Sequence, residues 1–251
     1  IVLRHDRLRT PEMVSPPSPT SLSSVWKSLL CSSGVLPRGL LRPRGLSVLD
    51  SMNVHRKTFL YTKILRWVRS KGLLPVAVAM SGIAALLLPG GSTAHSRFRL
   101  PVPLPLEDAV ANVAVRSETA DLLRNAALLV WDEAPTAPRA AVEAVDRCLR
   151  DVRGIDRPFG GLPTLLGGDF RQMPPILNGI DPTGFAAFTL KATPIWRSPG
   201  KIRKFALRSN RRADADVPFA KFLEEVGDGT WLSPSNNDNA AARSDDPAAA
   251  R

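Results

Sequence analysis

Short apolar segments alternate with segments of helical periodicity along the middle of this chain, and this alternation limits the folds open to it. Strands are predicted at residues 46–49, 76–80, 127–131 and 164–167. Helices are predicted from about residue 58 to a stop at Lys71-Gly72, and at residues 83–88 and 139–152. Strands separated by helices pair in parallel and are buried on both faces. The sequence therefore predicts an α/β fold, a parallel sheet with helices on both faces.

The alternation begins near Leu46, and the flanking segments differ in composition. Residues 1–44 are rich in Ser, Pro and Arg and have no sustained apolar period, so we predict that they are disordered. Residues 233–251 form a polar, Ala-rich segment for which we make the same prediction. The 251 residues, 44% of them hydrophobic, are enough for one α/β domain with a sizeable core.

Two further features bear on membranes and on metal or disulfide frameworks. The apolar segment 73–89 is shorter than the roughly 20 residues that a spanning helix needs, and Pro75 and Gly82 interrupt it. Cys31 and Cys148 are far apart and have no close Cys or His companion. We therefore expect a buried strand and helix at 73–89, no membrane partner, and neither a zinc site nor a disulfide.

Basic residues are concentrated in two zones. Lys and Arg number 34 against 23 Asp and Glu, a formal net charge of +11. Residues 51–106 hold eight Lys or Arg and no acidic residue, and residues 182–213 hold another eight and again no acidic residue. An excess of this size favours a polyanionic partner, and two unrelieved basic zones suit a nucleic-acid track. The alternative is a basic surface that serves only solubility.

The strongest motif follows the predicted strand at 127–131, where Asp132 and Glu133 stand together before Pro135. In a site that hydrolyses a nucleotide, the first acid of such a pair holds Mg²⁺ and the second orients or deprotonates the attacking water. The alternative is an acidic helix start, because carboxylates favour the first turn of a helix. The apolar run before the pair and Pro135 after it favour a strand end, and with it the functional interpretation.

A second strand end carries Asp169, Arg171 and Gln172 after two glycines. Gln172 is a candidate sensor of a terminal phosphate, and Arg171 is a candidate partner of either Asp169 or a phosphate. The alternative is a glycine-rich turn with a local salt bridge. In parallel sheets, ligands bind at the carboxyl ends of the strands, where this motif and the acidic pair are both predicted to lie.

A third motif occupies the place of a phosphate-binding loop between the first strand and the first helix. Lys57 and Thr58 match the final pair of the pattern G-x-x-x-x-G-K-[ST], in which consecutive backbone N–H groups turn toward phosphate oxygens. However, Ser51 and Arg56 stand at the two glycine positions, and β-branched Val54 lies inside the loop, where positive φ is unfavourable. Taken alone, these residues would not identify a phosphate loop.

In their order along the chain, six segments resemble the Pif-one family of DNA helicases, and its Helitron-transposon branch in particular. They are residues 57–61, 81–91, 93–96, 131–135, 168–172 and 227–230. The resemblance implies a RecA-like P-loop NTPase domain of a superfamily-one motor, which uses ATP and Mg²⁺ to move along single-stranded DNA and unwind duplex DNA. It also implies a first motor domain at 45–206 and, at 207–232, the start of a second domain that the chain does not complete.

The resemblance implies a role for each residue of the nucleotide site. Lys57 would contact the β and γ phosphates of ATP. Thr58 and Asp132 would serve Mg²⁺. Glu133 would be the catalytic base, and Gln172 would sense the γ-phosphate.

The resemblance also implies contacts with DNA and an arginine finger. The residues expected to touch the DNA backbone are Thr93, His95, Ser96, Arg97 and Arg99. Short polar groups and fixed cations suit contacts that do not depend on base sequence, although a lone histidine is also a common loop residue. Arg212 is the candidate arginine finger, and Arg211 is the second candidate. The alternative is that both belong to one more basic surface cluster.

Two departures from the family pattern limit the expected activity: the glycines before Lys57 are missing, and the second motor domain is expected to be incomplete. Without the glycines before Lys57, no row of N–H donors is preorganised for phosphate, so we predict weak or absent ATP hydrolysis. A non-catalytic nucleic-acid-binding remnant is therefore the alternative to an ATP-dependent DNA helicase. A third interpretation, an unrelated P-loop kinase, would need an intact loop. We expect a monomer in the nucleus, with the mitochondrion as the alternative compartment, and the resemblance implies roles in recombination, repair and telomere upkeep.

Overall fold

A six-stranded sheet forms the centre of the computed structural model, which describes residues 46–51, 56–172, 174–177, 181, 184–197, 202–207, 217–228 and 230. The strands are β1 (Leu46–Ser51), β2 (Leu74–Ala79), β3 (Ser92–Thr93), β4 (Ala126–Asp132), β5 (Thr164–Gly168) and β6 (Ile202–Leu207). Their order across the sheet is β3-β2-β4-β5-β1-β6, and every pairing between these strands is parallel. The predicted parallel α/β sheet is confirmed.

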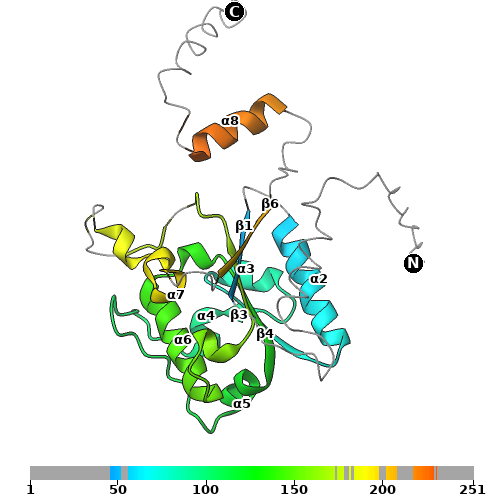
Figure 1. Cartoon of the computed structure of the whole chain (residues 1–251), viewed down its shortest axis with the longest axis vertical. Coiled ribbons are helices and arrows are strands. Elements are labelled where there is room, and N and C mark those ends of the chain that lie inside the picture. The colour runs from blue at the N-terminus through cyan, green and yellow to red at the C-terminus, as the bar shows by residue number, and fades with distance from the viewer. Residues whose placement is uncertain are drawn as a thin grey trace, which may run out of the picture.

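Helices follow the strands along the chain. The α-helices are α2 (Arg56–Ser70), α3 (Gly82–Leu87), α4 (Ala94–Phe98), α5 (Glu118–Asn125), α6 (Arg139–Arg153), α7 (Pro194–Arg197) and α8 (Val217–Asp228). Short 3-10 turns are η1 (Ala134–Thr136), η2 (Pro158–Gly161), η3 (Phe185–Phe188) and η4 (Leu190–Ala192). In Figure 1 the sheet runs between α2 on one side and α6 on the other. None of the helices described here is both long and apolar enough to cross a membrane.

The core divides into two layers because successive strand residues point to opposite faces of the sheet. In β2, Val78 belongs to the layer that α4, α5 and α6 cover, whereas Ala79 belongs to the layer under α2 and α3. In β4, Trp131 and Val130 divide between the same two layers. Helices therefore cover both faces, as the apolar strands predicted.

Local capping explains where several helices begin and end. Ser81, Thr93 and Ser117 precede α3, α4 and α5, and each side chain accepts a hydrogen bond from a backbone N–H of the first turn. Gly72 and Gly154 follow α2 and α6 with φ of 70° and 64°, the left-handed conformation that glycine adopts without strain. The predicted stop at Lys71-Gly72 is confirmed.

Several predictions concern residues outside the described part of the chain. These are the predicted disorder at 1–44 and 233–251, the loop residues 52–55, and both candidate arginine fingers, Arg211 and Arg212. They stay predictions, as do the proposed domain limits.

Candidate functional site

Three neighbouring strands deliver polar residues to one edge of the sheet. In the order β4-β5-β1, Asp132 ends β4, Gly168 ends β5 before the turn at 169–172, and β1 ends at Ser51. Asp50 of β1 pairs in register with Gly168 of β5. Helix α2 begins at Arg56, so only residues 52–55 join the end of β1 to Lys57 and its helix. The structure thus brings the three sequence motifs to one side of the molecule.

Asp132 is buried at this edge, with 8% of its surface exposed. Burial raises the pKa of its carboxyl above the usual range, because the charged form loses hydration. The backbone N–H of Glu133, which donates to Asp132 Oδ1 at 2.9 Å, and the charge of Lys57 act in the opposite direction on that pKa but do not reverse its rise. The positive charge of Lys57 thus acts on the Asp132 carboxyl across this edge of the sheet.

The raised pKa of Asp132 predicts an effect of pH on stability. A carboxyl whose pKa is higher in the folded chain favours folding below its unfolded pKa of about 3.9, and this contribution is lost as pH rises through the folded pKa. At neutral pH in EDTA we therefore expect Asp132→Asn to melt at a higher temperature than the unchanged chain. The gain should shrink as the pH approaches the unfolded pKa. Thermal melts across that range test this, and a variant that melts lower at neutral pH would contradict it.

Tyr61 of α2 packs beneath the site. Its side chain is fully buried, and its hydroxyl has no well-formed hydrogen bond among the described residues. Burial and then the nearby Asp132 carboxylate raise the pKa of Tyr61 well above its usual range. A Cβ atom on Gly167 of β5 would lie 1.6 Å from the Tyr61 hydroxyl, so only glycine leaves room for this ring against the strand.

Glu133 adopts an unusual backbone conformation, with φ 54° and ψ 29°. This left-handed region costs about 1–3 kcal/mol for a residue other than glycine and persists only where the surroundings impose it. Here the hydroxyl and the backbone N–H of Thr136 in η1 both donate to the Glu133 carbonyl oxygen. On the side-chain end, Glu133 Oε2 accepts from Ser81 Oγ at 2.8 Å and from Ser81 N at 3.3 Å. The catalytic candidate is therefore fixed at both its backbone and its carboxylate.

The turn after β5 is organised around the buried Asp169. The backbone N–H of Arg171 donates to Asp169 Oδ1 at 3.0 Å, and Gln172 Nε2 donates to Asp169 Oδ2 at 3.3 Å. Gln172 is itself exposed. Because β5 lies between β4 and β1, this turn follows the strand that separates Asp132 of β4 from the end of β1. The position agrees with a phosphate-sensing role for Gln172, which stays a prediction.

The residues present would fit a Mg²⁺ ion shared with nucleotide phosphates, with Asp132 and Thr58 as the ligands that the protein would supply. Mg²⁺ in such sites takes one or two carboxylates and keeps several water or phosphate oxygens. The described residues contain no group of three or more His, Cys, Asp and Glu side chains that would form a protein-only metal site. Asp132 offers one carboxylate, and Thr58 lies half-buried in the first turn of α2, next to Lys57.

The residues predicted to contact DNA lie together on β3 and α4. Thr93 accepts a hydrogen bond from Ser96 N at 3.1 Å, and Arg97 Nε donates to Ser92 Oγ at 3.2 Å. Arg99 ends α4 in the left-handed conformation and is exposed, whereas His95 is half-buried. The set is therefore gathered at one corner of the fold.

One strand separates this corner from the acidic pair. Ala79 of β2 pairs in register with Thr93 of β3 on one side and with Asp132 of β4 on the other. The structure thus places the predicted DNA contacts and the predicted nucleotide contacts along the same sheet edge, as neighbouring and distinct groups.

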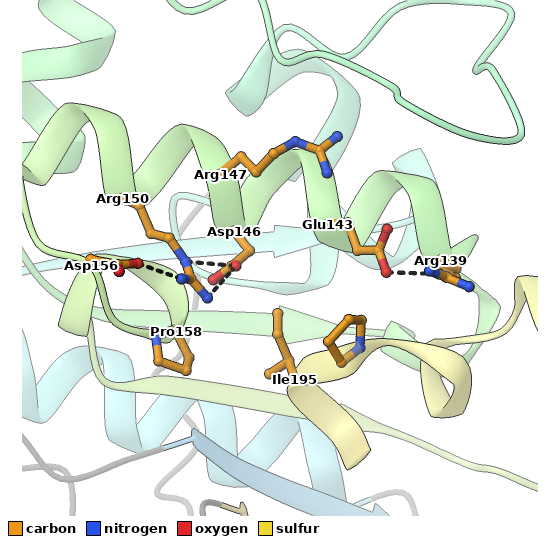
Figure 2. A pocket seen from close by; sticks show the side chains of 9 residues that line it. Arg139, Glu143, Asp146, Arg147, Arg150, Asp156, Pro158 and Ile195 are labelled. Atoms are coloured by element: carbon orange, nitrogen blue, oxygen red, sulfur yellow. Dashed lines mark hydrogen bonds and ion pairs between the residues drawn. The ribbon is translucent and has the colours of Figure 1, made fainter. Parts of the chain in front are cut away.

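A separate hollow of about 480 Å³ lies over α6, lined by arginines and carboxylates (Figure 2). Arg150 bridges Asp146 and Asp156, and Arg139 pairs with Glu143 at 2.7 Å. Arg147 turns away from these carboxylates and donates to the carbonyl of Ala109. These charged side chains already have protein partners. We therefore interpret the lining of the hollow as a network that ties α6 to the segments around it, rather than as a second nucleotide site.

Three residues that position the site were missed by sequence reasoning: Ser81 as a partner of Glu133, Tyr61 beside Asp132, and Gly167 beneath Tyr61. Ser81 did carry a signal, because Ser before a short apolar helix is a common N-cap. The other two carried none, since nothing in the local sequence shows that a residue of α2 packs on a glycine of β5.

A parallel sheet in this order, with Lys57 acting on the charge of Asp132 at its carboxyl edge, has the fold of a RecA-like P-loop NTPase domain. Solved structures agree on the fold. The crystal structure of Pif1 helicase from Candida albicans has a TM-score of 0.65 at 20% identity, covering 86% of this chain and 44% of that chain. Pif1 helicase from Bacteroides in complex with ADP-AlF3 and ssDNA has a TM-score of 0.59 at 22% identity, covering 75% of this chain and 44% of that one.

Sequence comparison gives the family. The PIF1-like helicase family matches residues 49–237, and this chain belongs to that family. The ATP-dependent DNA helicase PIF1 of Homo sapiens is 28% identical over 198 residues, which are 74% of this chain and 30% of the human protein. The PIF1 helicase of Trypanosoma brucei brucei is 31% identical over 195 residues, 72% of this chain and 19% of that protein. The chain thus spans less than a third of the length of these two relatives.

Proposed function

We propose that this chain acts as the first motor domain of an ATP-dependent DNA helicase, which couples ATP hydrolysis to movement along single-stranded DNA and to duplex unwinding. The observation that carries the proposal is that Lys57 acts electrostatically on the buried Asp132 at the carboxyl edge of the sheet, where β5 alone separates β4 from β1. Curated relatives are named ATP-dependent DNA helicases, and a Bacteroides relative was solved with ADP-AlF3 and ssDNA.

Each side chain has a part in the proposed reaction. Lys57 would hold the β and γ phosphates, while Thr58 and Asp132 would hold Mg²⁺, which when bound would neutralise charge that develops on the phosphates. Glu133 would accept the proton of the attacking water. Gln172 would donate a hydrogen bond to the γ-phosphate from the turn after β5. Arg212, or Arg211 in its place, would add a cation from the segment after β6.

We further propose that ATP hydrolysis is impaired in this chain. A phosphate loop works because glycines let consecutive N–H groups point at one anion, and Ser51 and Arg56 stand at those two glycine positions. The second candidate function is a nucleic-acid-binding remnant without catalysis. It is favoured by the missing glycines at positions 51 and 56 together with the basic zones at 51–106 and 182–213. A nucleotide titration separates the two.

The titration measures melting temperature and phosphate release with millimolar ATP and Mg²⁺. Under the helicase proposal we expect weak hydrolysis and a small rise in melting temperature, and both should disappear in Asp132→Asn because the Mg²⁺ ligand is lost. Ser117→Ala, at the remote N-cap of α5, is the control and should keep both responses. If the unchanged chain neither hydrolyses ATP nor gains stability, the enzyme proposal is wrong for this polypeptide and the binding remnant is left.

Single-stranded DNA binding is expected under both functions. The affinity should fall steeply with salt, since each phosphate contact contributes about −0.7 to the slope of log K against log salt. Replacing exposed Arg99 by Ala should weaken binding and reduce the magnitude of that slope by about 0.7 if it makes one such contact. An unchanged slope would remove Arg99 from the interface.

The remaining proposals concern oligomeric state, compartment and cellular role. We propose a monomer, although one related structure concerns unwinding at forked duplex DNA by two coordinating Pif1 helicases. A nuclear compartment, with the mitochondrion as the alternative, and roles in repair, recombination and telomere maintenance rest on family membership alone. Fractionation of cells that express the tagged chain would test the compartment.

A further inference from the structure

We infer that Ser81 is a positioning residue, which holds Glu133 away from the nucleotide crevice and releases it when nucleic acid binds the 81–99 segment. The inference rests on the proposed function, because it assumes that this segment contacts DNA and that Glu133 serves ATP hydrolysis. It adds a physical link between the two sites, which the family resemblance did not supply.

The Glu133 side chain is held on the β2 side of β4. Ser81 follows β2, and β2 lies on the opposite side of β4 from β5 and β1. A carboxylate hydrogen-bonded to Ser81 is therefore drawn toward β2, whereas Asp132 is close to Lys57 and Tyr61 on the β1 side. The two neighbouring carboxylates thus diverge, and Glu133 is the one directed away from the expected position of the phosphates.

The Ser81 hydroxyl makes two hydrogen bonds at once. It donates to Glu133 Oε2 at 2.8 Å and accepts from Ala84 N at 3.2 Å, as the N-cap of α3. The backbone N–H of Ser81 donates to the same carboxylate oxygen at 3.3 Å. Any movement of the start of α3 therefore changes the hydrogen bonds that hold Glu133.

Helix α3 buries little apolar surface against the rest of the fold. Its buried residues are the small side chains Ala84 and Ala85, whereas Ile83 and Leu86 are 79% and 86% exposed. A helix that buries so little apolar surface shifts at low cost in free energy. Beyond α3, the Gly91 N–H donates to the Leu88 carbonyl in a tight turn that leads directly into Thr93 and α4. A contiguous path therefore runs from the predicted DNA contacts to Ser81.

The expected change in DNA affinity follows from thermodynamic linkage between DNA binding and the Ser81–Glu133 contact. If binding of DNA breaks the Ser81–Glu133 contact, removing that contact beforehand favours the DNA-bound state, and the effect is reciprocal between the two sites. Coupling between sites changes affinity by about fivefold at its lower end. Ser81→Ala and Glu133→Ala should each tighten binding of single-stranded DNA by about fivefold.

A double-mutant cycle on the full chain tests this, with a fluorescein-labelled oligothymidine and anisotropy as the readout. Ser81→Ala combined with Glu133→Ala should again tighten binding about fivefold, not by the product of the two single effects. A purely electrostatic effect of removing the Glu133 charge would persist in the Ser81→Ala background, so the cycle separates the two causes. Ser81→Thr, which keeps the hydroxyl, should bind like the unchanged chain.

Ser117→Ala is the matched control, because Ser117 caps α5 with the same 3.2 Å bond to a backbone N–H, that of Ala120. It should lower thermal stability as loss of a cap does and leave DNA affinity unchanged. Additive single effects, or a Ser81→Ala variant that binds DNA no more tightly, would overturn the inference while the proposed function stands. A coupled cycle in a chain without ATP hydrolysis would support the link and overturn only the enzyme proposal. No DNA binding by the unchanged chain would overturn both.

Discussion

Replacing Ser51 and Arg56 together by glycine is expected to raise the affinity of this chain for Mg²⁺-ATP by about ten- to a hundredfold, the effect of one restored hydrogen bond to a charged phosphate. The structure supports the choice of positions, since β1 ends at Ser51 and α2 begins at Arg56, immediately before Lys57. Glycine at these two points lets the loop between them turn its N–H groups toward one phosphate, which side chains with a Cβ oppose.

Isothermal titration with ATP and Mg²⁺ measures this gain. The control is the same double variant with Lys57→Ala, in which the gain should disappear because the cation that pairs with the phosphates is missing. Glycine in the first turn of α2 should lower helix stability by about 1 kcal/mol, so melting temperatures need to be compared without nucleotide. If the double glycine variant binds ATP no better, the loop is not what limits nucleotide binding, and the proposed impairment has another cause.

Gly167→Ala is expected to destabilise the fold by about 3 kcal/mol, at the upper end of the usual range for overpacking. The new methyl would lie 1.6 Å from the Tyr61 hydroxyl and 2.7 Å from its Cζ atom. Tyr61 is fully buried between α2 and the sheet, so the ring has no space into which to withdraw. Because the same ring lies beside Asp132, the variant should also weaken any nucleotide response.

Urea unfolding of two further variants, Tyr61→Phe and Gly82→Ala, tests whether packing on Tyr61 causes this loss of stability. Tyr61→Phe removes a buried hydroxyl that lacks a well-formed hydrogen bond among the described residues, and should be close to neutral by itself. In that background Gly167→Ala should lose less stability, although the ring carbon at 2.7 Å still prevents full recovery. Gly82→Ala is the matched control, because a Cβ there meets nothing within 4 Å. Equal losses at Gly167 and Gly82 would show that packing on Tyr61 is not the cause.

The sequence predicted most of the sheet because its central strands are apolar on both faces. The predicted strands at 76–80, 127–131 and 164–167 correspond to β2, β4 and β5, with ends that differ by at most two residues. Elements with weaker local signals were not predicted. β3 has two residues, too few to show a period, and in β6 the exposed Arg203 and Lys204 interrupt the apolar pattern.

Local sequence patterns were enough to predict the chemistry at the strand ends. An acidic pair after an apolar strand, a Lys-Thr pair before a helix and a Gln-bearing turn are local patterns, and parallel strands carry such residues to one edge. The tertiary fold determines the order β4-β5-β1, the packing of Tyr61 on Gly167, and the contact of Ser81 with Glu133. These pairs are 106 and 52 residues apart. Contacts at such separations depend on the order of the strands and the packing of the helices. Local periodicity in the sequence predicts neither of these.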